Sequence, residues 1–144
     1  MSAPHVFHGA CHCGAITVEL AFSQPADAFQ VRSCQCGFCT RQGSITVSDP
    51  AGKATFRITA DALSLYAFET RTARSLLCRR CGIYAGVMQE ADGGLWSVAN
   101  VRGLGIAEFQ GRTGDPVRYD QETADERVNR RRQRWTPTEI QLTL

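Results

Sequence analysis

The chain reads Cys-His-Cys-Gly at residues 11–14, Cys-Gln-Cys-Gly-Phe-Cys at 34–39 and Cys-Arg-Arg-Cys-Gly at 78–82, and these segments contain all seven of its cysteines. Short C-x-C and C-x-x-C spacings bring two sulfur atoms toward one point, and thiolates are good ligands for tetrahedral Zn²⁺. Seven cysteines would leave one thiol unpaired in a disulfide framework, and C-x-C spacing is poor for a bridge within the pair. We therefore interpret the cysteines as zinc ligands that hold the fold together.

Seven ligands divide into a group of four and a group of three. A closed four-cysteine site is typical of structural zinc, whereas a three-ligand site keeps the open position of catalytic zinc. Joining the first and third segments would connect the two ends of a long stretch of chain. The predicted ligands of the structural zinc are Cys11, Cys13, Cys78 and Cys81, and those of the open, catalytic zinc are Cys34, Cys36 and Cys39. Spacing leaves open a crossed zinc ribbon, in which the last two cysteines of the middle segment join the third segment.

A glycine follows the second cysteine of each segment, at Gly14, Gly37 and Gly82. This placement predicts backbone with positive φ, which allows the chain to fold round a metal. Arg79 and Arg80 lie inside the third segment, where they either offset thiolate charge or are ordinary surface residues.

Alternation of apolar and polar residues with a period of two predicts a mainly β chain. The clearest strand runs over residues 16–21, where Ile16, Val18 and Leu20 share one face. Further strands are expected at 28–32, 44–48, 54–59, 63–68, 83–88 and 95–101, with turns at 24–25, 49–52 and 92–94. One helix is expected from Gln121 to about Arg132, docked by Trp135.

The length of 144 residues and the hydrophobic content of 43% fit one domain over residues 1–144. Residues 1–9 lack an apolar run of signal-peptide length, and no 18 consecutive apolar residues occur, so we expect a cytoplasmic protein without a membrane segment. A reducing compartment agrees with metal-bound thiolates.

The net charge is +2, and five arginines between residues 127 and 134 account for much of the basic content. Without them, eleven basic residues face fourteen acidic ones, which does not favour nucleic-acid binding. We expect this segment to be a solvated helix face neutralised by nearby acidic residues, with contact to RNA, DNA or an acidic partner as the alternative.

Three blocks of this sequence resemble the glutathione-dependent formaldehyde-activating enzyme family, also called the centromere protein V family. They are Gly9-Ala-Cys11-His-Cys13-Gly14-Ala15-Ile16, Cys34-Gln-Cys36-Gly-Phe-Cys39-Thr-Arg41-Gln-Gly43, and Leu63-Ser-Leu-Tyr66 through Arg74 to Cys78-Arg-Arg-Cys81-Gly82. The resemblance implies a β-tent fold of twisted antiparallel sheets held by zinc, with the same division of ligands. It also implies a carbon–sulfur lyase activity, the reversible combination of formaldehyde with glutathione to give S-(hydroxymethyl)glutathione.

Two departures from the family pattern bear on the substrate. Gln35 stands where related sequences commonly carry histidine, and residues 99–105 read Ala-Asn-Val-Arg-Gly-Leu-Gly in place of a segment like Gly-Thr-Leu-Asp-Asp-Pro. We expect the metal sites to survive these changes and substrate recognition to be altered. Because glutathione carries two carboxylates, Arg41 and Arg74 are the candidate residues for binding it.

Two other functions fit parts of the pattern. The chain can be a non-catalytic, zinc-stabilised binding module that acts through its β surface or its basic segment. A redox dithiol at Cys36 and Cys39 is disfavoured, because the βαβ context of thioredoxin-like proteins is missing and Cys34 is left without a role.

Histidine and aromatic residues are assigned no catalytic role. His12 should point away from the metal that its neighbours bind, and His5 and His8 are expected in a mobile N-terminal segment. Tyr66, Tyr84 and Trp96 are expected as core or cross-strand residues.

Overall fold

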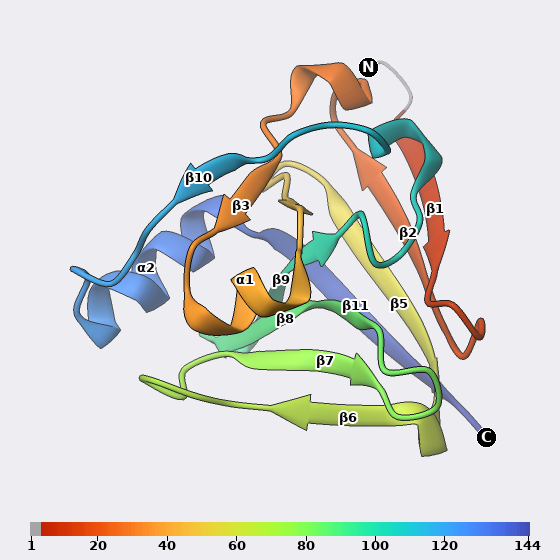
Figure 1. The fold of residues 1–144 in the computed structure, drawn as a ribbon. Coiled ribbons are helices and arrows are strands. Elements are labelled where there is room, and N and C mark those ends of the chain that lie inside the picture. Colours follow the sequence, from red (N-terminus) through yellow and green to blue (C-terminus); the bar gives the residue numbers. More distant parts are fainter. Residues whose placement is uncertain (1–3) are drawn as a thin grey trace.

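The computed structural model describes residues 4–144, and in this part of the chain strands predominate, as predicted (Figure 1). Eleven strands form one continuous mixed sheet. Most neighbouring strands are antiparallel, as expected, and two pairs are parallel. No helix in residues 4–144 combines the length and the apolar character needed to cross a membrane.

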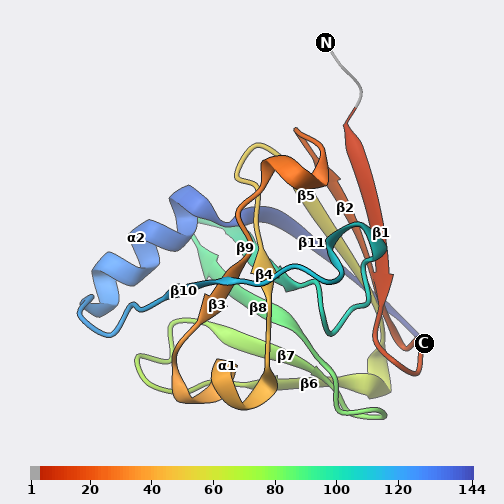
Figure 2. The same cartoon turned by 45° about the horizontal axis from the view of Figure 1, so that its top comes forward.

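Four strands lie side by side in one half of the sheet, as Figure 2 shows: β1 (His5–Ala10), β2 (Ile16–Phe22), β5 (Lys53–Thr59) and β11 (Thr136–Thr143). β2 is antiparallel to both β1 and β5, and β11 runs parallel to β5. The predicted alternation in β2 is confirmed, because Ile16, Val18, Leu20 and Phe22 are buried. The expectation of a mobile segment at His5 and His8 is wrong, since both lie in β1.

The second half of the sheet begins with four antiparallel strands that follow one another in the chain: β6 (Leu63–Tyr66), β7 (Arg74–Cys78), β8 (Tyr84–Ala91) and β9 (Gly94–Asn100). The predicted turn between β8 and β9 is confirmed. Its two residues, Asp92 and Gly93, have φ of 49° and 76°, as a tight hairpin turn requires.

β9 also joins the remaining strands to the sheet. It pairs with β4 (Thr46–Val47), which pairs with β3 (Arg32–Cys34), and β3 runs parallel to β10 (Asp115–Val117). The first residues of β11, Thr136 and Pro137, pair with β9, and the rest of β11 pairs with β5. β11 therefore connects the two halves of the sheet.

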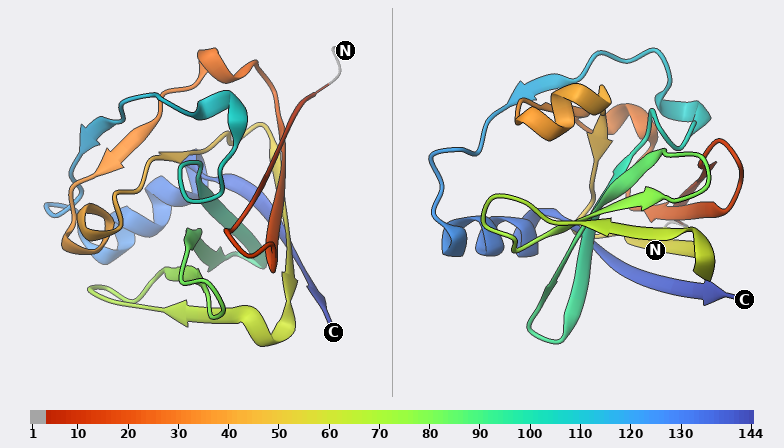
Figure 3. Two further views of the ribbon diagram at one scale, coloured as in Figure 1. Left: turned by 45° about the vertical axis from the view of Figure 1, so that its right-hand side comes forward. Right: turned by 60° about the horizontal axis from the view of Figure 1, so that its bottom comes forward.

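Helical structure is limited to α1 (Gly37–Gln42), α2 (Ala124–Arg134) and three short 3-10 helices, η1 (Ala26–Ala28), η2 (Ala60–Ala62) and η3 (Ala107–Phe109), within the described residues. α2 lies beside the sheet at the start of β11 (Figure 3). The predicted start of this helix is Gln121. In the structure the helix begins after Thr123, because Thr123 and Glu126 form a capping box with hydrogen bonds of 2.9 and 3.1 Å. Trp135 follows the helix and is 6% exposed, in agreement with its predicted docking role.

Several elements differ from the sequence-based prediction. The prediction of a strand at 28–32 is wrong, because residues 26–28 form η1 and β3 begins only at Arg32. The strand expected at 44–48 is reduced to β4. β1, β7, β10, β11 and α1 were not predicted. β10 and α1 are too short to show a period, and β1 and β11 carry many exposed residues, so their pairing is set by neighbouring strands.

The hydrophobic core lies against β1 and β2 and is closed by the segment after β9. Phe7 makes edge-to-face contacts with Phe22 and Phe109, at ring-centre distances of 5.8 and 5.3 Å. Leu104 and Ile106 are fully buried in the same core. Part of the segment that departs from the family pattern is thus core structure.

Candidate metal centres and the adjoining cavity

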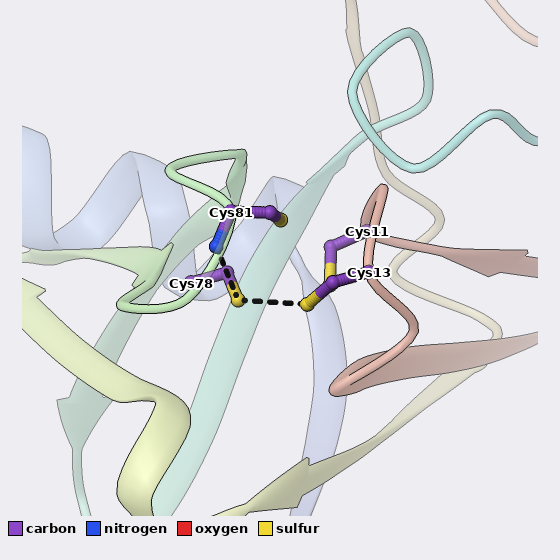
Figure 4. A group of neighbouring side chains, drawn as sticks. All are labelled: Cys11, Cys13, Cys78 and Cys81. Atoms are coloured by element: carbon purple, nitrogen blue, oxygen red, sulfur yellow. Dashed lines mark hydrogen bonds between the residues drawn. The ribbon is translucent and has the colours of Figure 1, made fainter.

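The first and third cysteine segments meet in space, as predicted (Figure 4). The sulfur atoms of the four residues lie within 4.8 Å of one another, with Cys13 3.6 Å from Cys78 and 3.8 Å from Cys11. A tetrahedral zinc site with bonds of about 2.3 Å places its sulfurs about 3.8 Å apart. The donor set therefore fits a closed zinc site. The crossed zinc ribbon is wrong, because the middle segment forms a separate group.

The two turns that carry this cluster share one backbone pattern. The N–H of Cys11 donates to the carbonyl of Ile16, and the N–H of Cys78 donates to the carbonyl of Ile83, both at 2.9 Å. Backbone N–H groups also reach the sulfurs, from Ile16 to Cys11 at 3.3 Å and from Cys81 to Cys78 at 3.5 Å. Such hydrogen bonds stabilise thiolates and orient them toward a metal.

Two of the three glycines have the predicted backbone. Gly14 and Gly82 have φ of 84° and 81°, whereas Gly37 is the first residue of α1 and does not have positive φ. Arg80 is exposed and pairs with Asp61 at 2.6 Å, which indicates a surface ion pair more than charge compensation at the sulfurs.

The middle segment forms a second cluster, in which the sulfurs of Cys34, Cys36 and Cys39 lie within 4.8 Å of one another. Cys34 ends β3, Cys36 caps the start of α1, and Cys39 lies one turn into that helix. The helix turn brings the N–H of Cys39 to the sulfur of Cys36 at 3.3 Å. Within residues 4–144, no further Cys, His, Asp or Glu belongs to this group, so the donor set fits zinc with an open position.

The three thiols of this cluster share hydrogen bonds and differ in acidity. Hydrogen bonds from Cys34 and Cys39, together with the backbone N–H groups of Cys39 and Phe38, lower the pKa of Cys36 to about 2. Hydrogen bonds to Cys34 and Cys36, with burial, raise the pKa of Cys39. Burial raises the pKa of nearby Tyr84 well above its usual value, and the charge of the neighbouring sulfurs raises it further. The hydrogen bonds to Cys36 therefore favour its thiolate form.

A cavity of about 250 Å³ opens beside the three-cysteine cluster, and all three cysteines line it. Small-molecule sites usually have roughly 300–1,000 Å³, and this cavity is slightly smaller, so it admits only a small ligand. Apolar and aromatic side chains form one part of its lining: Phe38, Phe68, Tyr84, Val87, Val98 and Trp135. Charged side chains form another part: Arg32, Arg118, Arg127, Arg130, Arg131, Glu69 and Asp120.

Three arginines of α2 line this cavity, and the expectation of a wholly solvated basic face is wrong for them. Arg127 is only 9% exposed, and Arg130 and Arg131 are half-buried. The sequence contained a signal for this placement, because residues 127, 130 and 131 have the spacing of one helix face. Because these residues are all arginines, their charge favoured the prediction of a solvated face.

Arg41 and Arg74, the predicted substrate-binding residues, are exposed and lie outside the lining of the cavity. Arg41 instead donates to the carbonyl of Gly37 at 2.9 Å. Gln35 does line the cavity, and its amide donates to the carbonyl of Ser33 at 2.8 Å.

The aromatic residues behave only partly as expected. Tyr84 is buried and contacts Phe38 edge to face at 5.0 Å, whereas Tyr66 is 50% exposed. Trp96 lies in β9 and does not line the cavity.

Comparison with known proteins places these sites in a family context. The model of the family described as glutathione-dependent formaldehyde-activating enzyme matches residues 6–106, a range that includes all seven cysteines. A crystal structure of a Rhodobacter sphaeroides protein is similar, with 32% sequence identity and a TM-score of 0.55. That similarity covers 76% of this chain and 97% of the other. Helix α2 lies outside the range matched by the family model.

Proposed function

This chain belongs to the glutathione-dependent formaldehyde-activating enzyme family, and we propose that it is a zinc-dependent carbon–sulfur lyase that makes and breaks the bond between a small thiol and an aldehyde. The family's description points to glutathione and formaldehyde, which combine to give S-(hydroxymethyl)glutathione. The observation that carries the proposal is the opening of a three-cysteine cluster onto a cavity of about 250 Å³.

Each cysteine cluster has its own role in this proposal. Cys11, Cys13, Cys78 and Cys81 hold a structural zinc. Cys34, Cys36 and Cys39 would hold a second zinc, which would supply a Lewis acid with an open coordination position. The remaining steps depend on how the surrounding side chains bind and shield the reactants.

The reaction joins the thiol sulfur to the aldehyde carbon, and the thiol proton ends on the former carbonyl oxygen. The protein has to bring two small reactants together and keep the adduct from bulk water. Phe38 and Tyr84 lie against each other beside the cysteines, and Val87 and Val98 extend the apolar lining. These side chains favour a dry reaction site, in which polar contacts to the reacting atoms are stronger.

The proposal is tested by the rate at which S-(hydroxymethyl)glutathione exchanges with formaldehyde and glutathione, measured by NMR exchange spectroscopy on zinc-loaded protein. The wild type is expected to accelerate the exchange. Cys36→Ser should abolish the acceleration, because it removes one ligand of the open site. Gln42→Ala is the matched control, since Gln42 is exposed on the same helix and does not line the cavity.

The alternative, a non-catalytic zinc-stabilised binding module, predicts a different result. In that case the two-zinc protein leaves the exchange rate unchanged with glutathione and with every other small thiol tested. Such an outcome would overturn the lyase proposal.

A further inference from the structure

One part of the cavity lining carries positive charge that the protein does not neutralise. Five arginines line the cavity, and the carboxylates among the described lining residues are Glu69 and Asp120. A third carboxylate, Glu122, accepts two hydrogen bonds from Nε of Arg130, at 2.9 and 3.1 Å. Three carboxylates therefore face five guanidinium groups, and the three thiolates with a bound Zn²⁺ would add one net negative charge, so that one positive charge remains beside the cysteine cluster.

Three cavity arginines form no ion pair within residues 4–144: Arg118 is exposed, whereas Arg32 and Arg131 are half-buried and donate only to neutral groups. Arg32 donates to the hydroxyl of Ser48 at 2.6 Å. Arg131 donates to the hydroxyl of Thr72 at 2.9 Å and to the side-chain oxygen of Gln89 at 3.2 Å. Nε of Arg131 is buried and has no hydrogen-bond partner.

The electrostatic environment of these two side chains is unfavourable without a counterion. Burial, with repulsion from Arg130 and Arg127, lowers the pKa of Arg131 to about 10. Arg32, in β3, is likewise half-buried and lines the same cavity. Arg131 thus remains charged at neutral pH, where a partly desolvated cation is stabilised by an anion that binds next to it.

The guanidinium of Arg131 is also held in place. Gln89, which is almost fully buried, accepts from Arg131 and donates to the carbonyl of Val128 in α2 at 3.0 Å. On its other side, Arg131 lies over the ring of Trp135, 5.1 Å from the ring centre. A cation fixed in this way loses little conformational entropy when it binds a ligand.

We propose that Arg32 and Arg131 form an anion subsite that binds a carboxylate of the thiol substrate, so that the protein selects acidic thiols over neutral ones. The cavity of about 250 Å³ limits the ligand to a small molecule. Arg131 belongs to α2, outside the range matched by the family model, whereas Arg32 lies inside that range. The assignment of the ligand as a thiol rests on the proposed function, whereas the inference that this subsite binds an anion does not rest on it.

The test uses S-methylglutathione, which carries the two carboxylates of glutathione but has no free thiol. Its binding to the zinc-loaded wild type is measured by isothermal titration calorimetry. Arg131→Met keeps an apolar stem and removes the charge, and it should weaken binding by about tenfold or more. Arg32→Met should also weaken binding, and Arg131→Lys should restore part of the loss. Arg132→Met is the matched control, because Arg132 lies on the same helix, pairs with Asp92 and does not line the cavity.

The possible outcomes separate this inference from the lyase proposal. Binding that depends on Arg131 and Arg32 but not on Arg132 supports the subsite, even if the wild type does not accelerate adduct exchange. Equal binding by all variants, or no binding at millimolar ligand, overturns it whatever the exchange rate. Inorganic phosphate is titrated in parallel. If phosphate binds through Arg131 and S-methylglutathione does not, the assignment to carboxylates is wrong.

Discussion

The sulfur atoms of Cys13 and Cys78 lie 3.6 Å apart, although 65 positions separate the two residues in the chain. Cys13 lies in the turn between β1 and β2, and Cys78 ends β7, so the contact joins the two halves of the sheet. A metal bound here would crosslink strands that do not pair with each other. This cluster should therefore contribute to stability as well as to metal content.

We expect about two zinc ions per chain, one for each cysteine cluster. Cys78→Ser should remove one zinc and lower the unfolding temperature markedly, because zinc binding to a folded site adds folding free energy. Cys36→Ser should also remove one zinc, with a smaller effect on stability. Elemental analysis and thermal unfolding measure both quantities. A single zinc in the wild type, unchanged in Cys36→Ser, would contradict an independent second site.

Asn100→Ala should destabilise the protein by about 2–4 kcal/mol. The buried side chain of Asn100 accepts from the N–H of Ile45 at 3.1 Å and donates to the carbonyl of Tyr84 at 2.8 Å. Alanine leaves both backbone groups without a partner. Urea unfolding measures the free energy of unfolding of this variant. Asn129→Ala, at an exposed position on α2, is the control. Equal stability of the two variants would refute this role.

Gly86→Ala should also destabilise the protein, by about 1–3 kcal/mol. A Cβ on Gly86 would lie 2.4 Å from the carbonyl oxygen of Val98 in the adjacent strand, and backbone cannot move aside easily. Gly37→Ala is the comparison, because a Cβ there meets only the end of the flexible Arg41 side chain at 3.0 Å. Chemical unfolding of both variants measures the difference, and a harmless Gly86→Ala would show that the strands can separate locally.

Glu69→Gln should strengthen the binding of S-methylglutathione by about threefold, on the scale of one partly screened charge interaction. Glu69 pairs with Arg127 at 2.6 Å, and the change leaves that cation of the cavity without a counterion. Calorimetric titration measures the effect. Glu90→Gln makes the same change of charge at an exposed position away from the cavity and should have no effect. Weaker binding in Glu69→Gln would argue against an anionic ligand.

The start of α2 should show a pH-dependent contribution to stability. Hydrogen bonds from the backbone and the side chain of Thr123 lower the pKa of Glu126 below its usual value. A carboxylate with a lowered folded-state pKa stabilises the protein above its ordinary pKa, and this contribution disappears as the pH falls through the lowered value.

Glu126→Gln should therefore be less stable than the wild type at neutral pH, with a difference that shrinks on acidification. Thr123→Ala should cost about 1 kcal/mol at neutral pH through loss of the helix cap. Thermal unfolding over a pH series measures both variants. A difference for Glu126→Gln that grows toward low pH would have the wrong sign.

The sequence by itself predicted the mainly β class and the grouping of the cysteines into a set of four and a set of three. Both follow from local rules, since the side chains of β2 alternate with a period of two and short cysteine spacings restrict where sulfurs can meet. The helix expected from Gln121 to about Arg132 agrees with α2 (Ala124–Arg134), whereas the capping box of Thr123 and Glu126 that sets its start was not recognised in the sequence.

Only the tertiary structure decided which cysteine segments meet and what lies beside the open cluster. The crossed pairing satisfies the same spacing rules, and it is excluded by the sheet topology that places Cys13 next to Cys78. The arginines near the cavity were misjudged for a related reason. Arg41 and Arg74 are close to the cysteines in sequence but point elsewhere, whereas Arg131 reaches the cavity because β11 places α2 against β8 and β9. Local patterns fix local geometry, but contacts between distant segments depend on how the strands pair.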